Sequence, residues 1–286
     1  MLSSPDEIKS ALDAYRAHVA SRNRKILEVY VPFIASAEPD EDADAGADDV
    51  EQLRMSSLRE LVCADEEDFE ELGIAAPGDV LERYDALAER LGLDGVTVSR
   101  GLAGERRQEW WDEYFDAVLS ALKTKCREEV RGTIEIPAEV RTLAGFVDSV
   151  DEPGLPKDYA SFLFWGLRDR IQGWGDHGRK AAETVRKSEE IMSGLDRTWE
   201  VAGGWELGDG GEEGTFCAVY CRREREEDED EEEWEWRYTY VTHCDFSSWV
   251  FDTIPQILEW YREFRDDEDP PKVDDLDATD VLYGIF

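Results

Sequence analysis

The spacing of hydrophobic residues changes once along this chain. Up to about residue 192, apolar residues recur at every third or fourth position, which is typical of amphipathic helices. A Ser-Ser-Pro start with Glu7 is a helix-start signal, and Pro32 is expected to end this helix near Tyr30. The pattern predicts helices over residues 5–30, 50–63, 65–72, 77–91, 105–130, 137–150 and 179–192, with a short one beginning at Pro156.

From Trp199 onward, apolar and polar residues alternate, as in half-buried strands. The alternation predicts antiparallel strands over residues 199–207, 215–222 and 236–244, and a short apolar run predicts another over 249–251. An amphipathic helix over residues 255–264 follows. The sequence therefore predicts an α+β fold, with a helical N-terminal region followed by a small, mostly antiparallel sheet packed by helices.

This pattern also suggests how the chain is divided. We expect a helical region over residues 1–132 with an acidic loop at 37–49, an α+β domain over 133–265 and an acidic C-terminal tail over 266–286. The loop is acidic and alanine-rich and has no large apolar residue, so we expect it to be flexible.

The chain is strongly acidic, with a formal net charge of -38 from 70 acidic and 32 basic residues. Such a surface repels the phosphates of nucleic acids and anionic lipids, so we expect neither a nucleic acid nor a membrane partner. It favours a protein partner with a basic surface. The acid is concentrated in tracts, which favours local solvated segments over the uniform acidification of a halophile; the tracts cover residues 38–49, 65–71, 224–235, 266–269 and 274–280.

The chain begins without the basic and then apolar segments of a signal peptide, and no stretch reaches membrane-spanning length. Its five cysteines are widely spaced and odd in number. Reduced thiols in the cytoplasm or nucleus are therefore expected.

Two stretches of the chain resemble a known family. The first is the Leu-Pro-x-x-Tyr-x-x-Phe-Leu segment at residues 155–163, and the second is the aromatic strand and closing helix at 250–261. Together they resemble the SUKH superfamily, which includes fungal cell-wall-synthesis regulators and bacterial toxin-immunity proteins. The resemblance covers roughly residues 136–264. It implies a small, mostly antiparallel sheet with helices on one side, in proteins that bind partners and are not enzymes.

Cysteine and histidine residues on the predicted strands are the main candidates for chemistry. Cys217 and Cys221 share a strand face, and His243 and Cys244 lie on the neighbouring strand. Because adjacent strand residues point to opposite faces, His243 and Cys244 do not suit one metal site. No local feature marks Cys217 and His243 as an activated pair. We therefore predict no catalytic residue, no metal and no cofactor.

Other local patterns have ordinary structural interpretations. The glycines at 203–204 and 208–214 lack the Lys-Ser/Thr of a phosphate-binding loop and are interpreted as a hairpin connection. The acidic residues at 226–233 lack the regular alternation of a calcium loop, so a solvated loop that steers a basic partner is expected.

Three tryptophans lie beside glycine or turn residues, where a ring is often half exposed; they are Trp174, Trp205 and Trp249. Each could anchor a partner or cap the core of the sheet, and the sequence leaves both alternatives open. With Glu229 and Glu231 of the acidic segment, they are the candidate partner-binding residues.

Three functions fit these observations. The first is a non-enzymatic interaction module, resembling the fungal regulators. The second is an immunity protein that neutralises a basic toxin. The third is an enzyme that uses Cys217, Cys221, His243 or Cys244. The sequence names neither the partner nor the oligomeric state.

Overall fold

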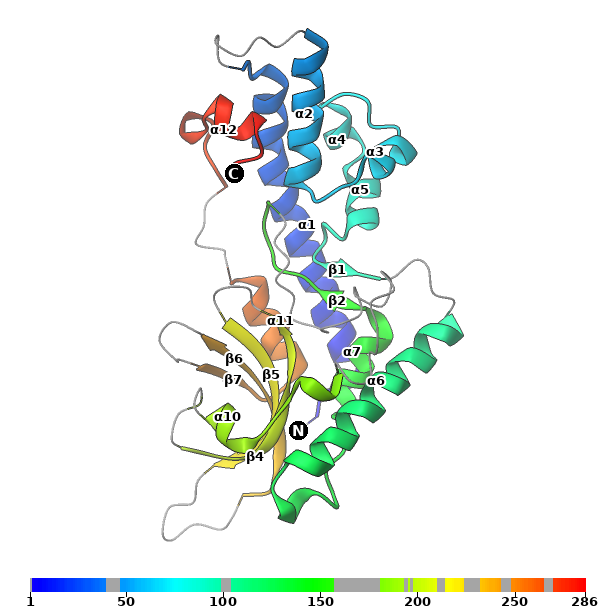
Figure 1. Cartoon of the computed structure of the whole chain (residues 1–286), viewed down its shortest axis with the longest axis vertical. Coiled ribbons are helices and arrows are strands. Elements are labelled where there is room, and N and C mark those ends of the chain that lie inside the picture. The colour runs from blue at the N-terminus through cyan, green and yellow to red at the C-terminus, as the bar shows by residue number, and fades with distance from the viewer. Residues whose placement is uncertain are drawn as a thin grey trace. The chain divides into compact units, whose positions relative to one another are not determined.

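The computed structural model in Figure 1 describes residues 2–39, 47–98, 104–156, 181–192, 195, 198–209, 214–223, 232–242, 248–264 and 270–286. The fold is α+β, with a helical N-terminal part and a five-stranded antiparallel sheet, as predicted. The described residues form two compact units that interleave along the sequence. Unit 1 takes them from Met1–Leu12, Thr97–Asp151 and Tyr159–Glu259, and unit 2 from Asp13–Val96, Glu152–Asp158 and Trp260–Phe286.

This division differs from the expected boundaries at residues 132 and 265. The helix α6 (Gly104–Lys125) belongs with the sheet, and the C-terminal residues belong with the helical unit. The units follow the packing of apolar faces. The periodicity of a segment shows which of its faces is apolar but not which other segment that face packs against.

Unit 2 is built from helices around one apolar core. Its elements are α1 (Pro5–Ser36, from Asp13 onward), α2 (Ala47–Leu61), α3 (Glu66–Leu72), α4 (Asp79–Glu82), α5 (Tyr84–Leu91), the 3-10 turn η2 (Val273–Asp275) and α12 (Ala278–Leu282). The core includes Leu27, Ile34, Leu58, Leu61, Val80, Leu87 and Val281.

The helix start and stop signals are confirmed where they rest on local chemistry. The Ser4 hydroxyl accepts the Glu7 N–H at 3.3 Å, and the Ser4 N–H donates to the Glu7 carboxylate at 2.7 Å, which is a capping box. The hydrogen bonds that the Ser4 N–H and the Ser4 hydroxyl donate to the carboxylate lower the pKa of Glu7. Gly73 and Gly92 end α3 and α5 in the left-handed conformation that glycine adopts without strain.

Two predicted helices of unit 2 have different limits. The first helix does not end near Tyr30 but continues through Pro32 to Ser36. Proline removes one backbone hydrogen bond, and the buried Ile34 holds the following turn against the core. The helix expected over residues 77–91 breaks at Arg83, where φ is -108° and ψ is 16°, and so forms α4 and α5.

The C-terminal segment is not a solvated acidic tail in its described part. Val281 and Leu282 are buried, and the Ser57 hydroxyl donates to the Val281 carbonyl at 2.6 Å. In Figure 1, α12 is the red helix next to the C-terminal end of α1, and it also contacts α2. The acidic Asp277 is itself structural, since its carboxylate caps α12 by accepting the N–H groups of Thr279 and Asp280.

Unit 1 contains the five-stranded sheet, in the order β3-β4-β5-β6-β7 with every neighbouring pair antiparallel. Its strands are β3 (Val185–Arg186), β4 (Trp199–Asp209), β5 (Gly214–Arg223), β6 (Glu235–Thr242) and β7 (Ser248–Phe251). The three strands predicted from the alternation and the one predicted from the apolar run are confirmed, except that residues 243–244 lie outside the described part. β4 and β5 pair through Asp209 and Thr215, which confirms the hairpin connection there.

The helical elements of unit 1 also differ from the prediction in places. α6 ends at Lys125 and a 3-10 turn, η1 (Glu128–Val130), follows; α7 (Ala138–Phe146) ends before β2 (Ser149–Val150), which pairs with β1 (Val96–Thr97). The segment expected to be helical over 179–192 contains β3 and the short α10 (Ser188–Met192). The closing helix is confirmed as α11 (Ile254–Arg262). The helix expected after Pro156 falls on residues 157–163, outside the described part.

The sheet has two different faces. The aromatic face is formed by alternate residues that pair across the strands: Trp205, Phe216, Ala218, Tyr220, Trp236, Tyr238, Tyr240, Trp249 and Phe251. The thiol face carries Trp199, Val201, Cys217, Val219, Cys221 and Val250, packed with Ile191 of α10. α10 lies against the thiol face and α7 contacts the aromatic face through Glu139 and Tyr238, whereas the SUKH resemblance implies helices on one side.

Glycine allows close approaches inside the sheet, of which the one at Gly203 involves Cys126. Gly203 lies within β4, where a side chain would overlap the thiol of Cys126 just after α6. The strand shifts its register between Val201 and Gly203, which is a bulge. Gly203 therefore serves the packing of Cys126 on β4, Gly204 lies close to Ile191 of α10 and the Ala218 carbonyl, and neither glycine is part of a hairpin connection.

A buried carboxylate joins three parts of unit 1. Glu139 of α7 is 1% exposed, and its two oxygens accept the Ser3 N–H at 2.6 Å and the Tyr238 hydroxyl at 3.0 Å. Burial and the neighbouring Glu139 raise the pKa of Tyr238 well above its ordinary value, so the phenol keeps the proton that it donates.

The bond from Tyr238 to Glu139 yields a stability prediction. Tyr238→Phe should lower the free energy of unfolding by about 1.5–3 kcal/mol, because it removes a hydrogen bond to a buried charged group. Tyr220→Phe, on the same face but half-buried, should change it by less than about 0.5 kcal/mol. Urea denaturation followed by tryptophan fluorescence measures both. Equal midpoints for the two variants would show that Glu139 does not depend on Tyr238.

Candidate functional site

The two cysteines of β5 share a face, as predicted, but that face is closed. Cys217 is 7% exposed and Cys221 is 1% exposed. Burial raises the pKa of each thiol to about 12, with a smaller opposing effect of Arg186 on Cys217 and of Arg237 on Cys221. Both side chains therefore remain protonated thiols at neutral pH, and a thiol is a poor nucleophile and metal ligand.

The two residues that could act together with these thiols, His243 and Cys244, lie outside the described residues. Within the described ranges, no group of three histidine, cysteine or acidic side chains is placed to hold a metal ion.

An arginine–tryptophan cluster lies at the ends of β4, β5 and β6. The Glu200 carboxylate accepts from Arg222 at 2.7 Å and also from Arg127. Both guanidinium groups lie over the Trp234 ring, at 4.3 Å for Arg222 and 5.8 Å for Arg127. Burial acts to raise the pKa of Glu200, but the hydrogen bonds from the two arginines outweigh it and the pKa is lowered.

This cluster brackets the acidic segment that carries Glu229 and Glu231. Those two residues lie outside the described part, whereas Arg222 and Trp234 on either side are held by the contacts above. Sequence reasoning missed the cluster, although basic residues at one end of an acidic tract and a tryptophan at the other were a visible signal.

The structure separates the candidate tryptophans. Trp205 is fully buried, with its ring 5.1 Å from that of Trp236. It belongs to the core and cannot anchor a partner, because its ring is closed off from the surface. Trp174 lies outside the described residues. Trp249 is 42% exposed on β7, with its ring tilted against Tyr240 at 6.0 Å.

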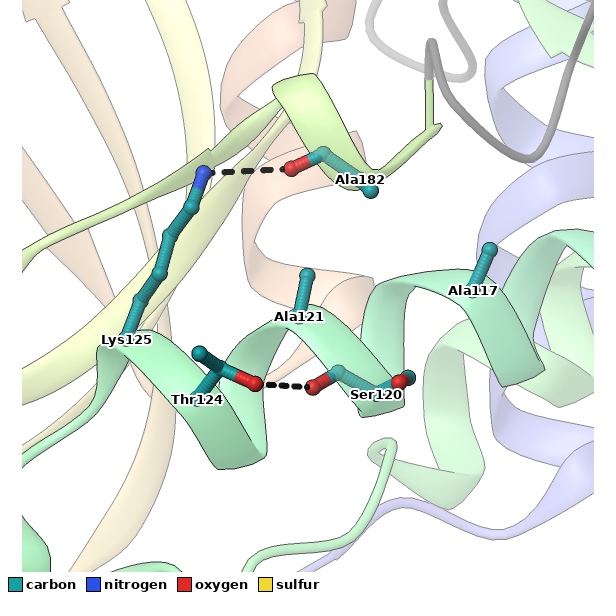
Figure 2. Close-up of a pocket in the computed structure, with 6 residues that line it drawn as sticks. All are labelled: Ala117, Ser120, Ala121, Thr124, Lys125 and Ala182. Atoms are coloured by element: carbon teal, nitrogen blue, oxygen red, sulfur yellow. Dashed lines mark hydrogen bonds between the residues drawn. The ribbon is translucent and has the colours of Figure 1, made fainter.

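An open groove of about 410 Å³ lies between α6 and Ala182, just before β3. Figure 2 shows its lining, which consists of Ala117, Ser120, Ala121, Thr124, Lys125 and Ala182. The Lys125 ammonium donates to the carbonyls of Ala182 and Val185, at 3.2 and 2.6 Å. The Thr124 hydroxyl donates to the Ser120 carbonyl. This lining offers small side chains and an already bonded lysine, and no acid–base or nucleophile–base pair.

In the part of the chain that the structure describes, no helix is both long enough and apolar enough to cross a bilayer. Comparison of this α+β chain with protein-family models, with curated protein sequences and with solved structures gives no match. The resemblance to the SUKH superfamily therefore stays a prediction.

Thiol labelling tests the closed thiol face. A maleimide added to the native chain at pH 7 should label the exposed Cys63 and leave Cys217 and Cys221 unlabelled until the chain is unfolded. Raising the pH to 9 should not make these two thiols reactive, since a pKa of about 12 keeps both protonated. Peptide mapping by mass spectrometry identifies the labelled residues. Rapid native labelling of Cys217 would instead favour the enzyme hypothesis.

Proposed function

We propose that this chain is a non-enzymatic protein-interaction module that binds a partner with a basic surface, in the cytoplasm or nucleus. The main support for the proposal is the exposure of Trp249, the candidate anchor that lies at the surface of the sheet. Tryptophan supplies a large contact area at a low cost in side-chain entropy, and it is enriched among residues that dominate binding energies.

The charge of the chain supports the choice of a basic partner. A net charge of -38 attracts basic proteins over distances of the order of the screening length, about 10 Å at 0.1 M salt. Such attraction raises the rate of encounter more than it raises the final affinity. The resemblance to the SUKH superfamily points in the same direction, since it implies binding proteins. The protonated state of Cys217 and Cys221 argues against an enzyme that uses them as nucleophiles.

Capture experiments test this function. The immobilised chain should retain a basic protein from the lysate of its host at low salt, and raised salt should slow the association rate measured with the purified partner. Trp249→Ala should weaken capture about tenfold or more. Tyr283→Ala is the matched control, because it removes another exposed aromatic residue, in unit 2.

Each part of the proposal can fail separately. Association that does not respond to salt would contradict electrostatic steering. Equal loss in the Trp249 and Tyr283 variants would remove Trp249 as the anchor. No partner at either salt concentration would overturn the proposed function.

A further inference from the structure

We draw no further inference here: the strongest candidate, the arginine–tryptophan cluster at the ends of β4, β5 and β6, has both of its guanidinium groups bound to Glu200 and stacked on the Trp234 ring, and no feature of the described residues shows a ligand that would displace them.

Discussion

The packing of unit 1 depends on one buried carboxylate. Removing Glu139 from water is costly, and the cost is offset only when Ser3 and Tyr238 both donate to it, across sequence separations of 136 and 99 residues. The indole N–H of Trp236 donates to the Glu135 carbonyl nearby, so β6 is fixed at two points. Because β7 pairs with β6, these bonds also determine where Trp249 lies.

The sequence predicts those parts of the fold that depend on local rules. The change of period places β4 to β7 and α11 within a few residues, and the capping signals at Ser4, Gly73 and Gly92 are confirmed. It misses β3, because a two-residue strand has no period of its own and exists through its pairing with β4. It misses the continuation past Pro32 because packing there outweighs a local preference.

The candidate site shows more clearly what a hydrophobic pattern does not predict. Trp205 and Trp249 have similar neighbours in the sequence, since each adjoins glycine or turn residues, yet one is buried and the other is 42% exposed. The place of each strand causes the difference: β4 lies inside the sheet and against α6, and β7 lies at the end of the strand order. Strand order depends on which segments pair over long separations, and a hydrophobic pattern does not contain that information.

The electric field of this acidic chain also depends on how its basic residues are paired. Many of its few basic residues are engaged in ion pairs, as Arg107 is with Asp148 and Arg237 with Asp252. The outward field therefore comes mainly from the more numerous carboxylates. Such a field attracts basic proteins and repels acidic ones before any side chains make contact.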